Sequence, residues 1–141
     1  RGLGDVYKRQ ILLLLLIFSL ATFAQNKNLN YLKIIQKVCL PKKGFQLVLK
    51  QIVSDSRCPE GVNCIWAGEV KLLISVYQDK QFVTDEAVTI SENSFQENKD
   101  WFVRYLPSTK KNVQTITVFP YPKEGIKINP TDYYLKIGYL K

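Results

Sequence analysis

The chain has 141 residues, of which 46% are hydrophobic and 23% are charged, and its formal net charge is +8. It contains no histidine, which excludes Ser-His-Asp and Cys-His catalysis as well as zinc sites that need imidazole ligands. Its three cysteines are too few for a four-thiolate zinc site or an iron–sulfur cluster within one chain. The sequence therefore assigns no catalytic residue, no metal ligand and no cofactor.

An apolar segment near the start, Ile11–Ala24, predicts a secretory signal peptide. It follows Lys8 and Arg9, and as a helix it would span roughly 21 Å, less than the hydrocarbon core of a bilayer. We expect cleavage after Ala24, and an uncleaved membrane anchor is the alternative. The preceding residues, Arg1–Gln10, resemble translated read-through at the ends of fragmentary metagenomic sequences, so we expect them to be a sequencing artefact. The sequence thus predicts an exported protein of the periplasm, the cell envelope or the medium, which contacts a membrane only through its signal peptide.

The rest of the chain, residues 25–141, predicts a single all-β domain. Seven runs with period-two or β-branched patterns are bounded by turn residues and predict strands. They cover Tyr31–Leu40, Phe45–Val53, Ala67–Tyr77, Gln81–Ile90, Trp101–Leu106, Val113–Phe119 and Tyr133–Leu140. We expect an antiparallel β-sandwich of about seven strands, with a small β-barrel as the second choice.

Local signals refine this expectation at a few positions. Gln78-Asp79-Lys80 predicts a hairpin turn, and Gly138 predicts a bulge or a close backbone approach within the last strand. An amphipathic helix over Leu29–Cys39 is a weaker alternative to the first strand. The segment Ser91–Lys99 is expected to be an exposed loop with room for one helical turn.

Two cysteines, Cys58 and Cys64, enclose five residues that include Pro59 and Gly61. In an exported protein this short spacing predicts a structural disulfide. The chain-entropy model assigns such a loop about 2 kcal/mol of stabilisation. A metal held by the two thiolates and a redox-active pair are weaker alternatives, because no histidine is available and the spacer is not the two-residue one of thioredoxin-like sites.

The third cysteine, Cys39, has several possible states. It could be a buried thiol that behaves as a small apolar residue, or it could pair with another chain. It could also pair with Cys58 or Cys64 instead of the bridge that we expect. Without an imidazole partner it is a poor nucleophile, so we do not assign it a catalytic role.

Four side chains beside the cysteine pair form a candidate interaction patch: Asp55, Arg57, Trp66 and Glu69. One interpretation is structural, with Trp66 packed over the disulfide and Arg57 paired with Asp55 or Glu69. The other is an exposed Arg–Trp surface that anchors a partner, as such residues often do at interfaces. A glycosidase-like acid/base pair of Asp55 and Glu69 is a remote third possibility.

The pattern Asp55-Ser56-Arg57-Cys58-Pro59, followed by Cys64 and Trp66-Ala67-Gly68-Glu69, resembles a group of small uncharacterised exported proteins and lipoproteins of Bacteroidota. Val118-Phe119-Pro120-Tyr121-Pro122 and Asp132-Tyr133 are similar to further segments of that group. The resemblance covers most of residues 45–139 and implies an exported β protein, but it implies no activity. This chain departs from the group in having Cys39 and in lacking a lipid-attachment cysteine.

The sequence favours a non-catalytic binding module whose partner is a protein, a peptide or a glycan. The alternative is a hydrolase that relies on carboxylates alone, with Asp85, Glu86, Glu97 and Asp100 as candidates. A Ca²⁺ site built from such oxygens would be a variant of either function. A nucleic-acid-binding barrel is third, supported only by charge and aromatic content, and we expect no nucleic-acid partner for an exported protein.

Overall fold

The computed structural model describes residues 28–37 and 43–141, together with Gln10. Cys39, the expected signal peptide and nearly all of the first ten residues lie outside the described residues. The described strands are β1 (Asn30–Ile34), β2 (Phe45–Asp55), β3 (Val70–Gln78), β4 (Gln81–Ile90), β5 (Asn112–Phe119) and β6 (Tyr134–Leu140). One α-helix, α2 (Phe95–Tyr105), and three short 3₁₀ turns, η1 (Glu92–Ser94), η2 (Ser108–Lys110) and η3 (Pro130–Asp132), complete the described elements.

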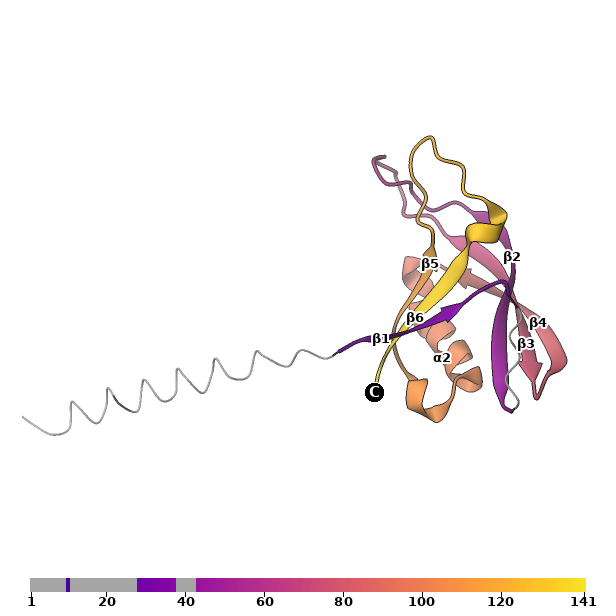
Figure 1. Cartoon of the computed structure of the whole chain (residues 1–141). Coiled ribbons are helices and arrows are strands. Elements are labelled where there is room, and N and C mark those ends of the chain that lie inside the picture. The colour runs from indigo at the N-terminus through magenta and orange to yellow at the C-terminus, as the bar shows by residue number, and fades with distance from the viewer. Residues whose placement is uncertain (1–9, 11–27, 38–42) are drawn as a thin grey trace, which may run out of the picture.

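The strands form two three-stranded antiparallel sheets, with the orders β1–β6–β5 and β2–β3–β4 (Figure 1). Each sheet keeps its own ladder, and within the described residues the two sheets do not close into a barrel. They meet at a backbone hydrogen bond of 3.0 Å, in which the Leu49 N–H donates to the Ile35 carbonyl just after β1. The fold is therefore mostly β, as expected, with two open sheets instead of a closed barrel.

One apolar core lies between the two sheets and is completed by α2. Alternate residues of the central strands point inward, as the period of two requires. The core comprises Ile34, Leu49, Val70, Leu72, Ile74, Val88, Phe102, Leu106, Val113, Val118, Leu135 and Ile137. Both sheets contribute to this set, and Phe102 of α2 is completely buried within it.

The strand predicted over Trp101–Leu106 is wrong, because Trp101–Tyr105 is the second half of α2 and Leu106 follows its last residue. The loop expected over Ser91–Lys99 is also wrong, since η1 and the first half of α2 occupy it. Asn98 and Phe102 are both buried and are four residues apart, which is the spacing of one helical face. The Asn98 side-chain amide donates to the Thr89 carbonyl at 2.8 Å and so fastens the helix to β4. The aromatic residues of this segment therefore belong to a helix, although their composition is typical of a strand.

The other local predictions are largely confirmed. A two-residue turn at Asp79 and Lys80, both with positive φ, joins β3 to β4. Gly138 lies opposite an irregularity between Val113 and Thr115, where a Cβ would collide with the Thr115 hydroxyl. The expected first strand is shorter than predicted, because β1 ends at Ile34, and the helix considered for that region is not formed over residues 30–34.

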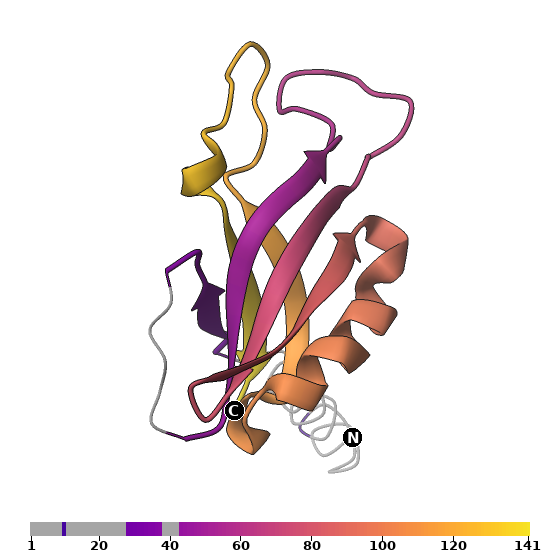
Figure 2. The ribbon, with the colours of Figure 1, turned by 90° about the vertical axis from the view of Figure 1, so that its right-hand side faces the viewer.

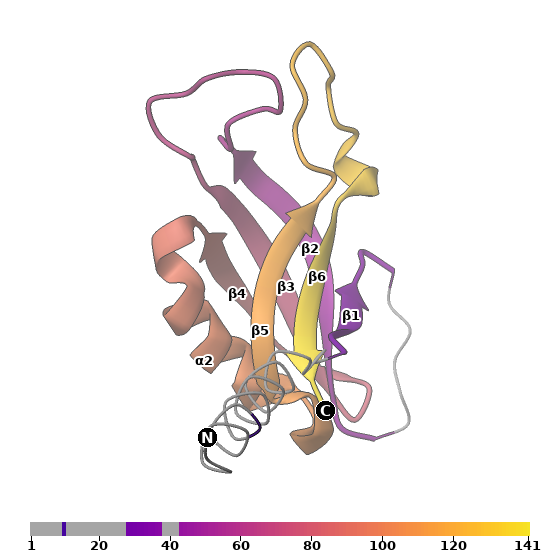
Figure 3. The ribbon, with the colours of Figure 1, turned by 90° about the vertical axis from the view of Figure 1, so that its left-hand side faces the viewer.

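Two long loops, one from each sheet, gather at one end of the molecule. Residues 56–69, between β2 and β3, and residues 120–133, between β5 and β6, protrude beside one another in Figures 2 and 3. The same views place α2 alongside β4 and β5, and the C-terminus at the end opposite the loops. No helix in the described part of the chain is long and apolar enough to span a membrane.

Candidate functional site

The cysteine loop, residues 56–69, is closed by the predicted disulfide between Cys58 and Cys64, whose Cα atoms are 5.9 Å apart. Its base continues the β2–β3 ladder, since the Ser56 N–H donates to the Glu69 carbonyl at 2.8 Å and the Cys58 N–H to the Ala67 carbonyl at 2.9 Å. The loop is therefore held both covalently and by backbone hydrogen bonds.

A buried ion pair lies at the foot of this loop. The Arg57 guanidinium donates from Nε to Asp55 Oδ1 at 2.8 Å and from Nη2 to Asp55 Oδ2 at 2.6 Å. The two side chains are only 9% and 10% exposed, respectively. Arg57 also donates to the carbonyls of Val118 at 2.6 Å and Pro120 at 2.9 Å, and the Tyr133 hydroxyl donates to Asp55 Oδ2 at 3.1 Å. This cluster joins the end of β2 to the end of β5 and the start of β6.

The cluster shifts the titration of its own members. Burial raises the pKa of the Asp55 carboxyl, but hydrogen bonds and charge from Arg57, together with the Tyr133 hydroxyl, outweigh it and hold that pKa below 3.8. Burial raises the pKa of the Tyr133 hydroxyl, and the neighbouring Asp55 carboxylate raises it further. Both shifts favour an ionised Asp55 and a neutral Tyr133 at physiological pH.

The second loop, residues 120–133, is attached to the cysteine loop through Glu60. The Glu60 N–H donates to the Pro122 carbonyl at 2.9 Å, and the Glu60 carbonyl accepts from the Glu124 N–H at 3.4 Å. The Glu60 carboxylate also lies 3.5 Å from the Lys123 ammonium. At the base of the second loop, the Tyr121 ring lies under the Arg57 guanidinium, with 5.1 Å between Cζ and the ring centroid. The two loops therefore form one structural unit, which we call the loop end.

The loop end carries large apolar side chains in water. Ile65 is fully exposed, Trp66 is 62% exposed, and Ile126 on the second loop is 64% exposed. Val62, within the disulfide-closed segment, is 41% exposed. Such a group of exposed apolar side chains on a monomer typically marks an interaction site.

The four residues of the predicted patch do not form one surface. Asp55 and Arg57 are brought together as a bidentate pair, which is the structural interpretation, and their side chains offer little surface to a partner. Trp66 is 62% exposed, as the second interpretation of the patch expects. Glu69 is partly exposed and its carboxylate lies 3.1 Å from the Lys71 ammonium. Only the Trp66 part of the predicted patch lies on an exposed apolar surface.

Sequence reasoning missed Ile65, Ile126, Glu60 and Tyr133 as parts of this end. Ile65 was visible as the neighbour of Trp66, and Tyr133 as part of the Asp132-Tyr133 segment. The contact of Glu60 with the second loop had no signal in the sequence, because the two segments are about sixty residues apart in the chain.

The carboxylates considered for hydrolysis lie on two different elements. Asp85 and Glu86 are adjacent on β4 and therefore point to opposite faces of the sheet. The Asp85 carboxylate is already occupied by the Lys50 ammonium at 2.5 Å and the Ser75 hydroxyl at 2.6 Å. On α2, Glu97 is the one carboxylate of the described residues that lines the cavity between β4 and the helix, whereas Asp100 accepts from the Gln96 amide at 3.0 Å.

Among the described residues, no group of three or more Asp, Glu or Cys side chains is placed to hold a metal ion.

Comparison of the chain with protein-family models, with curated protein sequences and with solved structures gave no match.

Proposed function

We propose that this protein is an exported, non-catalytic binding module, built on a six-stranded β-sandwich, whose loop end contacts a protein partner. The observation that carries the proposal is the full exposure of Ile65 beside the exposed Trp66. Covering one large apolar side chain contributes about 1.5–3 kcal/mol, and Trp is among the residues that most often dominate binding energies.

A protein partner fits this surface better than a glycan. Three of the five exposed large apolar side chains of the loop end, Val62, Ile65 and Ile126, are aliphatic, and the other two, Trp66 and Tyr121, are aromatic. Aliphatic groups gain by excluding water against another apolar surface, and they offer no planar face on which a sugar ring could stack. Lys123 and Glu60 at the side of the loops supply the polar rim that protein interfaces usually have.

Export is supported by two features. The segment Ile11–Ala24 has the composition of a secretory signal, and the disulfide is of a kind that persists in oxidising compartments. Both features agree with the resemblance to exported Bacteroidota proteins, which we extend to this chain as part of the proposal.

The test is capture of partners from a native envelope extract by the oxidised protein, followed by affinity measurement with the purified partner. The variant Ile65→Ser/Trp66→Ala should bind at least about tenfold more weakly, because it removes the apolar anchors. The matched control is Phe82→Ala, which removes an aromatic side chain that is 57% exposed in the β3–β4 hairpin, away from the loop end. This control should retain the wild-type affinity.

Three results would count against the proposal. The first is that Ile65→Ser/Trp66→Ala and Phe82→Ala lose affinity for the partner equally. The second is that both variants retain the wild-type affinity. The third is saturable binding to purified envelope polysaccharide that depends on Trp66 while no protein is enriched.

A further inference from the structure

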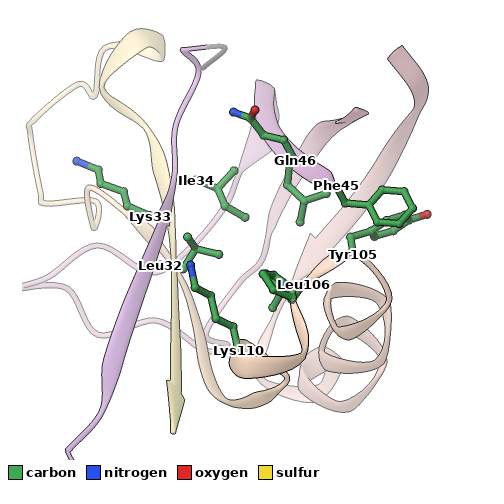
Figure 4. Close-up of a pocket in the computed structure, with 10 residues that line it drawn as sticks. Leu32, Lys33, Ile34, Phe45, Gln46, Tyr105, Leu106 and Lys110 are labelled. Carbon is green, nitrogen blue, oxygen red and sulfur yellow. The ribbon is translucent and has the colours of Figure 1, made fainter. Parts of the chain in front are cut away.

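A separate cavity of about 190 Å³ lies at the other end of the molecule, between β1, β2 and the C-terminal end of α2 (Figure 4). Its wall combines polar and apolar surface, and the apolar part includes the side chains of Leu32, Ile34, Phe45, Leu47, Tyr105 and Leu106. Ile34 and Leu106 belong to the buried core, so the cavity reaches the core through the gap between the two sheets. The Phe45 and Tyr105 rings pack edge to face at 5.4 Å and form one side of it.

The charged residues around this cavity are all basic. Lys33 and Lys110 are among the lining residues, and no Asp or Glu of the described segments is. Lys33 points away from the cavity in Figure 4, and its ammonium lies 3.7 Å from the centroid of the Tyr134 ring. The Lys110 side chain instead extends along the cavity toward Leu32. In the described part of the chain the Lys110 ammonium has no carboxylate partner within ion-pair distance.

The backbone at η2 fixes where the Lys110 side chain begins, and its ammonium lies 5.9 Å from the centroid of the Tyr139 ring. The Lys110 N–H donates to the Pro107 carbonyl at 2.8 Å, which closes the short turn that follows α2. Pro107 also lines the cavity, so the turn and the wall are one structure. Lys110 is half-buried, which lowers the dielectric around an ion pair that it forms there and strengthens the attraction.

An amide lies at the opposite rim of the cavity. Gln46 is above Ile34 in Figure 4, and its Oε1 is buried with no hydrogen-bond partner among the described residues. Buried polar atoms are normally paired, so an unpaired amide at a cavity is a place where a ligand group can bind. Rotation about the last side-chain bond would present either its oxygen or its nitrogen to that group.

We propose that this cavity binds a small amphipathic carboxylate, with the carboxylate paired to Lys110 and the apolar body against Leu32, Ile34 and Leu106. Because both charged residues that line the cavity in the described part of the chain are lysines, the head group that fits is an anion. The volume of the cavity limits the apolar part of the ligand, because a dry cavity of about 150 Å³ holds a benzene molecule and this cavity is slightly larger. An alkyl chain of about eight carbons or a single aromatic ring matches that space.

Octanoate is the probe, with octylammonium as the matched cation of equal chain length. Isothermal titration of the oxidised, full-length protein should show saturable binding of octanoate and at least about tenfold weaker binding of octylammonium. In ¹³C-resolved NMR spectra, the methyl signals of Leu32, Ile34 and Leu106 should shift with the same saturation curve.

Two lysine variants locate the head group. Lys110→Gln should weaken octanoate binding about 10- to 100-fold, which is the range expected for loss of a charge-assisted contact. Lys136→Gln should leave the affinity unchanged, because Lys136 is not among the residues that line the cavity and its ammonium lies 3.8 Å from the centroid of the Tyr31 ring. Equal thermal unfolding of both variants and wild type ensures that folding is not the cause.

The proposal is overturned if octanoate gives no saturable signal at millimolar concentration, or if octylammonium binds equally well. It is also overturned if the two lysine variants lose the same affinity, or if the shifted methyl groups lie elsewhere. Because the cavity and the loop end lie at opposite ends of the molecule, Ile65→Ser/Trp66→Ala should not change octanoate binding. Failure of either proposal therefore leaves the other one intact.

Discussion

The Tyr133 hydroxyl donates a 3.1 Å hydrogen bond to Oδ2 of Asp55, although the two residues are 78 positions apart in the sequence. Asp55 ends β2 in one sheet and Tyr133 precedes β6 in the other. This bond therefore links the two sheets directly below the loop end, at a carboxylate that Arg57 already holds from two sides.

Replacing Tyr133 with phenylalanine should destabilise the protein by about 1 kcal/mol, because one partly buried hydrogen bond to a charged group is lost. Urea denaturation with an unchanged m-value would measure this loss. Tyr121→Phe is the control, since its ring contacts Arg57 but its hydroxyl takes no part in the Asp55 cluster. Equal midpoints for Tyr133→Phe and wild type would show that the bond does not contribute.

Acid should destabilise the protein partly through Asp55. The pKa of Asp55 is depressed in the folded state, so its contribution is complete above the unfolded value of about 3.9 and is lost as the pH falls through the folded value. Unfolding free energies measured between about pH 2 and 6 should therefore fall less steeply with acid in Asp55→Asn than in wild type. Parallel curves of unfolding free energy against pH for Asp55→Asn and wild type would show that Asp55 does not contribute to the acid dependence.

Asp85 gives an independent comparison in the same pH window. Hydrogen bonds from Lys50 and Ser75 lower its pKa as well, so wild-type stability loses this contribution together with that of Asp55. Asp85→Asn should reduce the dependence of the unfolding free energy on pH in acid without altering the loop end. Asp55→Asn should reduce that dependence too, and it should also destabilise the loop end locally. Amide exchange of the residue 56–69 backbone distinguishes the two variants.

Removing the disulfide by Cys58→Ser/Cys64→Ser should lower stability by about 2 kcal/mol and lower the melting temperature by several degrees. Reduction of the wild-type protein should produce the same shift, and reduction of the variant should produce none. Identical melting curves for oxidised wild type and variant would remove the structural role of the bridge.

Gly68→Ala should be one of the most damaging small substitutions in the chain. Gly68 has a φ of +77°, and an added Cβ would collide with the Ser56 carbonyl, so we expect a loss of about 2–5 kcal/mol. Gly44→Ala is the matched control, because Gly44 has a φ of +90° but no atom of the described residues lies within 4 Å of an added Cβ. Its cost should be only the conformational one of about 1–2 kcal/mol. Similar losses in both variants would show that the close approach at Gly68 is not limiting.

The parts of this fold that the sequence predicted are those governed by local chemistry. The β3–β4 turn, the bulge at Gly138 and the Cys58–Cys64 bridge each depend on residues close in the chain or on one special residue. Six of the seven predicted strands overlap described strands for the same reason, since alternation along a strand is a local pattern.

The parts that were missed depend on partners far away in the sequence. Trp101, Phe102 and Tyr105 have high strand propensity, but burial of Phe102 under two sheets selects the helix, and tertiary packing overrides propensity. Arg57 could have paired with Asp55 or Glu69 from spacing alone. Its choice of Asp55 follows from the carbonyls of Val118 and Pro120, which hold the guanidinium in one orientation.

The backbone hydrogen bonds of Glu60 with Pro122 and Glu124 have a consequence for the proposed binding at the loop end. Ordering a mobile side chain or loop on binding costs about 0.5–1.5 kcal/mol for each flexible side chain. Here part of the backbone entropy is already lost during folding, so a partner bound as proposed would meet a preorganised loop and should dissociate more slowly. A lesion in the buried Asp55–Arg57 pair would then reduce affinity at Ile65 and Trp66 without altering a single contacting atom.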